Sequence, residues 1–402
     1  MLNVLIMVVV LAAGGVLMLP RLARAPLWRA TITPLASIIG SGFLVIGPIL
    51  HVSFGYLSPL VMAVLCVGAY LFGTAIRFNI AAIERGPSGR GLVGRGPVER
   101  TLETAASWAL AFAYVISVAY YLNLFGAFGL SLTDLSDPFH ARLLTSGVFL
   151  VILAVGWSYG FKALERIEQV TVGIKLAIIA GLLFGLGWYF VGKISGGGVA
   201  VARPSLSGWA AATLVFGLLV TVQGFETSRY LGDEYDAGTR IRSMKIAQGL
   251  AALIYMIYIT FLSLSFNGDV IKLEETAIIG LLGVVAPILS VLLVAAALSA
   301  QFSAAVADAG GSGGLIAELT GHRVQPRGAY AGLVAAGLAL TWGADVFDII
   351  GYASRAFAVY YGLQAAIATV TAWRLGQHKR AAGFALLTVL GAMIAVFGTA
   401  VE

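Results

Sequence analysis

The sequence IIGSGFLVIGPIL, at residues 38–50, decides how this chain can fold. Two glycines flank Ser41 inside a run that is otherwise apolar enough to cross a membrane. Because glycine leaves the backbone uncovered and loses the most entropy in a helix, Gly40, Ser41 and Gly42 could unwind the helix near mid-span. Close packing of two membrane helices through small residues is the alternative interpretation, and this motif taken alone favours it.

A second interrupted run, VQGFETSRY, occupies residues 222–230. Glu226 follows Gly224 and Phe225 within this apolar stretch. A carboxylate is costly in lipid, so it is expected to face a cavity or a partner, and a functional role is favoured here. The two breaks lie five predicted spans apart, which is the interval expected of two inverted five-helix repeats that each begin with a broken helix.

The composition indicates a membrane protein. Of 402 residues, 59% are hydrophobic and 11% are charged, whereas soluble domains carry about 25% charged residues. No long polar segment is left for a soluble or nucleic-acid-binding domain, and the single cysteine, Cys66, excludes a disulfide framework or a cysteine metal cage.

A transmembrane helix needs about 20 mostly apolar residues. The sequence predicts twelve such spans, at residues 1–19, 31–52, 57–78, 104–130, 143–160, 168–191, 208–230, 245–266, 281–308, 328–343, 347–374 and 382–400.

The basic residues predict the orientation of these spans. If Met1 lies outside, 18 of the 25 Lys and Arg residues fall in inner loops and four in outer loops, which is the asymmetry of the positive-inside rule. The four outer residues are Arg142, Lys193, Arg203 and Lys272. Three basic residues, Lys175, Arg229 and Arg355, are left at membrane depth.

Four motifs together resemble the amino acid/polyamine/organocation (APC) superfamily with the leucine-transporter fold. Residues 38–50 are similar to the family's first-helix signature, and GFETSRYLGDEYDAGTR at 224–240 is similar to its sixth helix. KALERIEQVTVGIKLAII at 162–179 resembles the entry to core helix 5, and residues 346–375 resemble core helix 10. The motifs are short, but their order and spacing are fairly specific.

The resemblance implies an all-α polytopic membrane protein of about twelve transmembrane helices. Residues 1–19 would form an extra N-terminal helix, residues 31–191 the first inverted repeat, residues 208–374 the second repeat and residues 382–400 the final helix. We expect an integral protein of a bacterial-type inner membrane with both termini outside.

The resemblance also implies a secondary active transporter of a small organic solute, most simply an amino acid or related zwitterion, working by alternating access. The solute carboxylate would meet backbone N–H groups of the first break, and its amine would meet carbonyls of the second. The residues expected to bind it are Ile39, Gly40, Ser41, Gly42, Val222, Gln223, Gly224, Phe225 and Glu226.

Lys175 lies about ten residues into a predicted span, too deep to reach either surface easily. Burial disfavours its ammonium form, so this group could gain and lose a proton during transport. By resemblance it borders the cation site of sodium-coupled relatives, with Ser299 and Ser303 as hydroxyl partners. We therefore expect proton coupling rather than sodium coupling, with no cofactor and no metal.

Glu226 and Arg355 lie at similar predicted depths, and three roles for them are open. They could form a structural ion pair, a gate that opens and closes during transport, or, through Arg355, a site for an organic anion. Relatives usually have an uncharged residue in place of Arg355.

The sequence also suggests positions for several other polar and aromatic residues. Asp233, Glu234 and Arg240 are expected in an inner loop, either as part of an inner gate or as solvated charges. Asp308 is expected at the water-facing end of its helix, because Gly310–Gly314 follows. Among the aromatic residues, Phe225 is favoured over Phe43, Tyr114 and Phe357 as a pocket residue.

The alternatives to a transporter are an intramembrane serine protease and a channel or sensor. Gly310-Gly311-Ser312-Gly313 matches the motif around an intramembrane serine nucleophile, but no histidine is placed to activate Ser312. A channel or sensor on the same fold would not need a buried titratable lysine. The expected partners are a small solute and the lipid bilayer, with no nucleic acid, and the sequence leaves the oligomeric state open.

Overall fold

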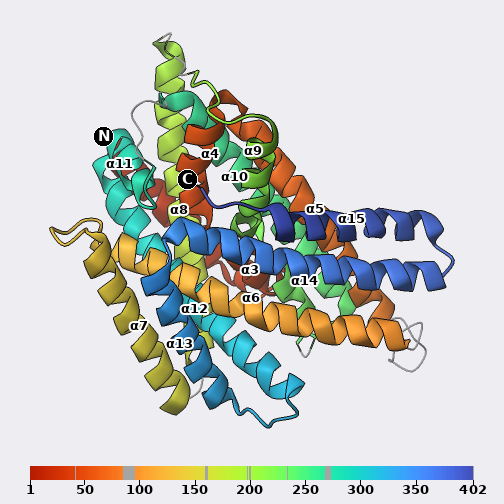
Figure 1. Ribbon diagram of the computed structural model, residues 1–402. Helices are drawn as coiled ribbons and strands as arrows, with labels where there is room; N and C mark the ends of the chain where they lie inside the picture. The colour runs from red at the N-terminus through yellow and green to blue at the C-terminus, as the bar shows by residue number, and fades with distance from the viewer. Residues whose placement is uncertain are drawn as a thin grey trace.

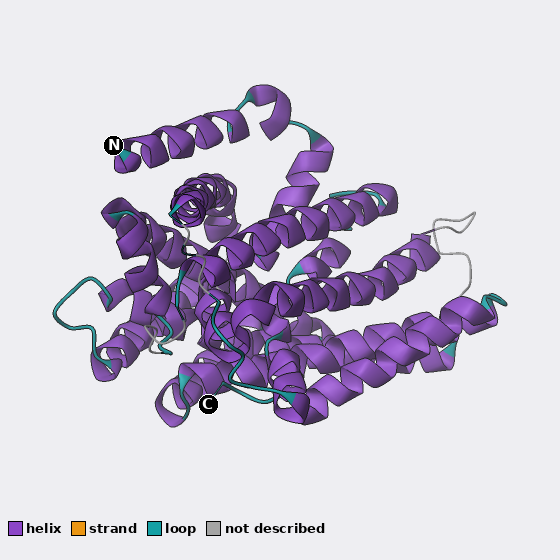
Figure 2. Ribbon diagram, turned by 90° about the horizontal axis from the view of Figure 1, so that it is seen from above, coloured by secondary structure: helices purple, strands orange, loops and turns teal. Residues whose placement is uncertain are grey.

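The computed structural model describes residues 1–40, 42–84, 96–158, 162–196, 198, 201–232, 234–267 and 273–401, with the backbone alone for residues 83–84 and 162–171. Every regular element in these ranges is helical (Figure 1, Figure 2). The predictions for Ser41 and Asp233 lie outside the described residues.

Fifteen α-helices and three 3-10 helices make up the described chain. They are α1 (Leu2–Leu17), α2 (Pro20–Ala23), α3 (Pro26–Ile38), α4 (Gly42–Phe54), η1 (Gly55–Leu57), α5 (Ser58–Glu84), α6 (Pro97–Leu130), α7 (Pro138–Ser158), α8 (Lys162–Ser195), α9 (Gly208–Gly217), η2 (Leu219–Val222), η3 (Phe225–Tyr230), α10 (Ala237–Ser265), α11 (Ala277–Val285), α12 (Pro287–Leu319), α13 (Pro326–Gly343), α14 (Val346–Arg374) and α15 (His378–Phe397).

Seven stretches within the described ranges are long and apolar enough to cross a membrane: Gly42–Ala82, Pro97–Leu130, Pro138–Ser158, Val172–Ser195, Ala237–Ser265, Pro287–Leu319 and His378–Phe397. The chain is therefore an integral membrane protein. The total of twelve spans and the orientation of the termini stay predictions.

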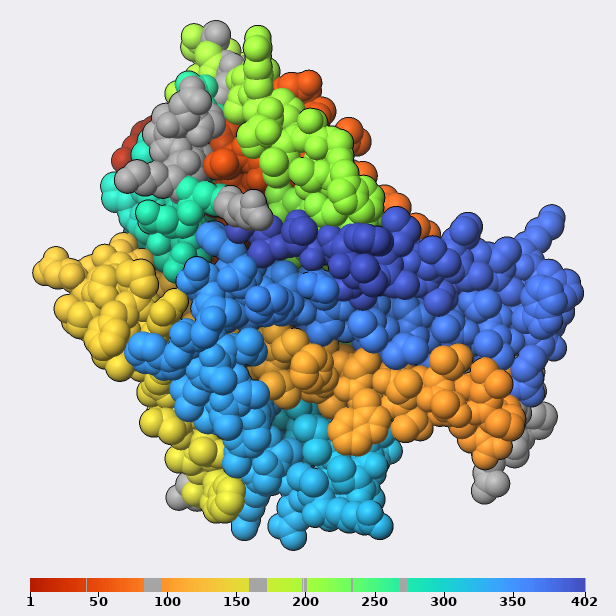
Figure 3. All heavy atoms as spheres, in the orientation of Figure 1, coloured from red at the N-terminus to blue at the C-terminus, as the bar shows by residue number. Residues whose placement is uncertain are grey.

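At the centre of the bundle, the long helix α6 packs against both α12 and α14. The antiparallel pair α14 and α15 projects to one side as a ridge, with α6 lying along α14 (Figure 3). Helix α1 lies at the edge of the molecule against α8 (Figure 2). The fully buried Ile6 anchors it, in contact distance of a Cβ placed on Gly185.

The predicted span 281–308 has different bounds in the structure. It is divided at Ala286, whose backbone is extended, because Pro287 has no N–H to continue the helix from α11 into α12. At the other end, α12 continues through Gly310–Gly314 to Leu319. Tertiary packing explains this continuation, since Tyr330 lies where a Cβ on Gly313 would be and Ser312 donates a hydrogen bond to the Ala111 carbonyl.

Candidate functional site

Both sequence breaks are real interruptions, and they lie side by side. Helix α3 ends at Ile38 and α4 begins at Gly42, while the seventh predicted span divides into α9, η2 and η3. The contacts pair α3 with η3 and α4 with η2. The local cause in the second segment is Gly224, whose φ of 114° is open to glycine and strained for other residues.

Tyr255, on α10, joins the two breaks. Its hydroxyl lies 2.9 Å from the Ile38 carbonyl and 2.6 Å from the Thr221 carbonyl. A phenol has one proton, so it donates to one carbonyl at a time. Because the Tyr255 proton can pass from one carbonyl to the other, this contact is compatible with the two broken segments shifting relative to each other.

Glycine also sets how closely the breaks approach. A Cβ on Gly42 would lie 2.5 Å from Thr221 Cα, and one on Gly224 would lie 2.6 Å from the Ser37 carbonyl carbon. The close-packing interpretation of the first motif is therefore correct for Gly42, in addition to the break.

A small polar cavity lies beside the breaks, between α3, α6, α8, η3 and α12. Its volume is about 20 Å³, which is the scale of one water molecule. In this conformation the space is too small for an amino acid. Its polar lining consists of Ser37, Tyr121, Lys175, Gln223, Glu226, Thr227, Ser303 and Asp308.

Lys175 joins α8 to the first broken helix. Its side chain is buried, with 6% exposure, and Nζ donates a 2.7 Å hydrogen bond to the Ala36 carbonyl. Ala36 lies in the last turn of α3, where carbonyl groups lack helical N–H partners. The ammonium therefore binds the negative end of the α3 dipole.

Asp308 lines the same cavity, which corrects the sequence-based expectation. It was expected at a water-facing helix end, but α12 extends to Leu319 and leaves Asp308 inside the bundle, half-buried and hydrogen-bonded by the Ser117 hydroxyl. One ammonium, of Lys175, and two carboxylates, of Asp308 and Glu226, therefore share one small space.

Glu226 is buried, and its hydrogen-bond partners lie in its own segment and on α14. Its Oε2 accepts hydrogen bonds from the Gly224 N–H, at 2.9 Å, and from the Tyr361 hydroxyl, at 2.7 Å. Phe225 stacks on the same tyrosine ring, with centroids 5.0 Å apart. These contacts tie the second break to α14.

The expected pair between Glu226 and Arg355 is absent from this conformation. Arg355 is exposed on α14, and its Nε donates to the Ala395 carbonyl of α15 at 2.8 Å. The sequence placed both residues at similar depth but could not assign Arg355 to a helix face, because that depends on where α15 packs.

The predicted site residues divide into two groups. Lys175, Gln223, Gly224, Glu226 and Ser303 line the cavity. Ile39, Gly40, Gly42, Val222, Phe225 and Ser299 do not line it. The cavity meets the first broken helix at Ala36 and Ser37, just before the break.

The comparison with known families now decides the class of the protein. A family profile described as an APC superfamily transporter matches residues 20–398. The chain belongs to the APC superfamily of transporters. It is similar to an uncharacterized protein of Aquifex aeolicus (strain VF5), with 40% identity over 384 residues that cover 95% of this chain and 93% of the relative. The family is one of transporters, so the serine protease alternative is rejected.

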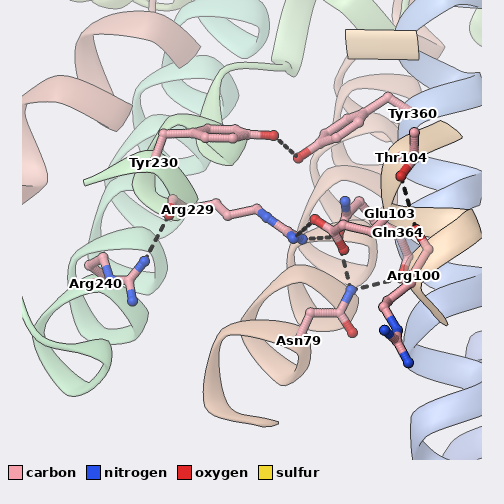
Figure 4. Close-up of polar contacts among 9 residues, drawn as sticks. All are labelled: Asn79, Arg100, Glu103, Thr104, Arg229, Tyr230, Arg240, Tyr360 and Gln364. Carbon is pink, nitrogen blue, oxygen red and sulfur yellow. Dashed lines mark hydrogen bonds and ion pairs between the residues drawn. The ribbon is translucent and has the colours of Figure 1, made fainter. Parts of the chain in front are cut away.

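This APC transporter has a second polar cluster, centred on Arg229 (Figure 4). From η3, the Arg229 guanidinium reaches Glu103 on α6 and Gln364 on α14 and binds both. The two charged side chains are largely buried, with 9% exposure for Arg229 and 21% for Glu103. We name Arg229, Glu103, Gln364 and Asn79 the Arg229 cluster.

The remaining contacts of the cluster reach two more helices. Asn79 on α5 donates to the carbonyl and to the side-chain oxygen of Gln364, each at 2.9 Å. Arg240 on α10 donates to the Arg229 carbonyl at 2.7 Å. The cluster thus joins the second broken segment to four helices of the APC transporter.

Three features could not be assigned from the sequence: the position of Asp308 at the cavity, the contact of Tyr361 with Glu226 and the partners of Arg229. The signal for Arg229 was available, since a basic residue at membrane depth requires an acidic or polar partner. The partner could not be chosen, because Glu103 and Gln364 are more than 120 residues away in the chain.

Proposed function

We propose that this transporter moves a small organic solute, an amino acid or related zwitterion, by proton-coupled alternating access on the five-plus-five inverted-repeat fold. The observation that carries the proposal is Lys175, whose ammonium is buried and bound to the end of a broken helix beside two carboxylates. Such a group stabilises one arrangement of the helices when protonated and a different one when neutral.

The helix order supports the inverted repeat. The first broken pair, α3 and α4, is followed by α5, α6, α7 and α8, and the second broken segment is followed by α10, the short α11, α12, α13 and α14. If α11 and α12 are taken together, three of the four helix pairs at equivalent positions contact each other: α5 with α10, α6 with α12 and α7 with α13. This arrangement is typical of two repeats that enclose a site near the middle of the membrane.

The solute would bind between the two breaks. Its carboxylate would meet N–H groups of residues 40–42 at the start of α4, where the helix dipole favours an anion. Its amine would meet the carbonyls of residues 222–224 and the side chain of Gln223. The Gln223 Oε1 atom is buried without a hydrogen bond, while its Nε2 atom donates to the Tyr121 hydroxyl, so an acceptor is available for an amine.

Proton release from Lys175 would free α3. The neutral amine binds the Ala36 carbonyl less strongly than the ammonium does, because the charge-assisted part of the hydrogen bond is lost. Release toward the more alkaline cytoplasm would then let α3 move away from α8. The ammonium takes the place that a sodium ion would need, so sodium coupling is disfavoured.

The Arg229 cluster would serve as the inner gate. It connects η3, part of the second broken segment, to α5, α6 and α14. These hydrogen bonds and the ion pair must break before that segment can move away from the bundle. An organic-anion transporter that uses Arg355 would need this residue at the cavity, and it is exposed on another face of α14.

Solute exchange in proteoliposomes tests the proposal. Vesicles preloaded with a mixture of unlabelled amino acids should accumulate labelled amino acids faster than empty vesicles, and the uptake should saturate. Saturable exchange for at least one amino acid is expected. Linear uptake that internal solute does not accelerate would favour a channel and contradict the proposal.

A further inference from the structure

A large groove opens on the surface of the bundle, and its lining shares no residue with that of the polar cavity. Its volume is about 660 Å³, and it lies between α5, α10, the turn after α14 and α15. This space is far larger than the 20 Å³ cavity beside the breaks. It takes no part in the proposed transport path.

The groove has basic residues at three points of its lining. They are Arg77 on α5, Lys245 on α10 and Arg380 on α15, and the described lining contains no carboxylate. Lys245 is exposed and makes no hydrogen bond or ion pair with any described residue. Arg380 is exposed and donates to Gln377, the residue before α15, so both cations are available to a ligand.

Arg77 is fixed in the wall of the groove. Its guanidinium donates to Gln248, to Thr74 and to the Tyr70 carbonyl, and it lies 4.5 Å from the Tyr70 ring centroid. These three bonds use three of its five N–H donors. Two N–H donors of Arg77 therefore remain, and the other three already fix the position of its guanidinium.

Apart from Thr74 and Gln377, the rest of the groove lining is apolar. Phe78 and Phe384 pack together with ring centroids 5.1 Å apart, and Leu386 and Leu387 continue the wall along α15. Gly383 also lines the groove, and a Cβ placed there would meet no atom within 4 Å. The groove is therefore open where a hydrocarbon chain could lie.

We propose that this groove binds an anionic phospholipid of the inner leaflet. The phosphate would bind Lys245 and Arg380, with the remaining donors of Arg77 beneath it, and an acyl chain would lie along Phe78 and Leu386. Charge complementarity selects an anionic over a zwitterionic head group, because each basic residue near the membrane surface contributes roughly 1 kcal/mol of attraction to anionic lipid. The predicted orientation of the helices places this end of α5, α10 and α15 on the inner side, where the anionic surface potential attracts such clusters.

Native mass spectrometry of the full-length protein in detergent tests this site. The probes are dioleoyl phosphatidylglycerol and dioleoyl phosphatidylcholine, titrated separately. Lys245→Gln and Arg380→Gln should each weaken binding of the phosphatidylglycerol about fivefold, which is the free-energy contribution of one basic residue converted to affinity. Binding of the phosphatidylcholine should change little. Lys379→Gln is the matched control, because Lys379 is exposed on the same helix and does not line the groove.

A second pair of variants tests the apolar part. Gly383→Leu should fill the groove and displace the lipid, while Gly332→Leu, on the exposed face of α13 with nothing within 4 Å of its Cβ, should not. Unfolding temperatures identify any variant that fails to fold. If Lys379→Gln weakened phosphatidylglycerol binding as much as Lys245→Gln and Arg380→Gln, the attraction would be a general one to the charged surface, and the proposed site would be overturned. Unchanged phosphatidylglycerol binding in Gly383→Leu would overturn it as well.

Discussion

At the residue scale, Gly224 is a position where both the backbone angle and the packing exclude a side chain. Its φ of 114° is strained for any other residue, and a Cβ would lie 2.6 Å from the backbone of Ser37. Gly224→Ala should therefore destabilise the protein by about 1–3 kcal/mol. The measurement is the unfolding temperature in detergent.

Gly332→Ala is the control for that substitution. Gly332 lies in helix α13 with open space around it, so alanine should be neutral or slightly stabilising there. Equal unfolding temperatures for the Gly224 and Gly332 variants would contradict the claim that the second break depends on a left-handed glycine.

Some features of the candidate site could be predicted from the sequence, and others could not. The buried position of Lys175 and the break at Glu226 could be predicted, because a charge in an apolar run must be enclosed. The role of Asp308 could not, since the glycines after it were interpreted as the end of the helix. Packing of Tyr114 and Tyr330 against Gly311 and Gly313 allows the helix to continue instead.

At the scale of elements, the Arg229 cluster ties η3 to α6 and α14. Neutralising one partner leaves a lone buried charge, so Glu103→Gln should destabilise the protein by about 3 kcal/mol. The double variant Arg229→Gln with Glu103→Gln should be less destabilised than the single variant. Thermal unfolding of the two single variants and the double variant measures this coupling.

An exposed ion pair provides the matched control. Arg142 and Asp345 join α7 to the start of α14 at 3.1 Å, and the Asp345 side chain is 81% exposed. Neutralising this pair should change stability by less than about 1 kcal/mol. A Glu103→Gln variant no less stable than Arg142→Gln would remove the case for an inner gate at Arg229.

The start of α10 gives a pH-dependent prediction outside the spans. Asp236 caps this helix by accepting from the Thr239 N–H at 3.0 Å and from its hydroxyl at 2.8 Å, and these bonds lower the pKa of the carboxyl. Because the folded pKa lies below the ordinary value, the stabilisation is present above that value and is lost as the pH falls through the lowered pKa.

Asp236→Ala should therefore lower the unfolding temperature at neutral pH, and its deficit should shrink in acid as the wild-type carboxyl becomes protonated. Asp236→Asn, which still caps but does not titrate, is the control and should keep a nearly constant difference from Asp236→Ala. A deficit of Asp236→Ala that stays constant through the acid range would contradict this account of the cap.

At the scale of the whole molecule, apolar run lengths predicted the position of most helices, and the two breaks predicted where the small polar cavity lies. The kink at Ala286 was missed, although Pro287 marks it, because the run of apolar residues continues across it. The predicted orientation rests on loop charges alone and needs an independent test.

Cysteine labelling of intact cells tests the orientation. In a Cys66→Ser background, His140→Cys should react with an impermeant reagent added outside, and Lys379→Cys should react only after permeabilisation. His140 lies half-buried in the first turn of α7, and Lys379 is exposed in the first turn of α15. The reverse pattern would invert the topology and place the lipid groove in the outer leaflet.

The central claim is that Lys175 couples solute entry to proton entry. Its most direct test is the lumenal pH of proteoliposomes that contain a trapped pH dye, after a mixture of amino acids is added outside without sodium. The account predicts solute-dependent acidification by the wild-type protein and its loss in Lys175→Ala, with Lys193→Ala, a half-buried residue at the far end of the same helix, behaving as wild type. A strict sodium requirement in the wild type, or unchanged acidification in Lys175→Ala, would contradict it.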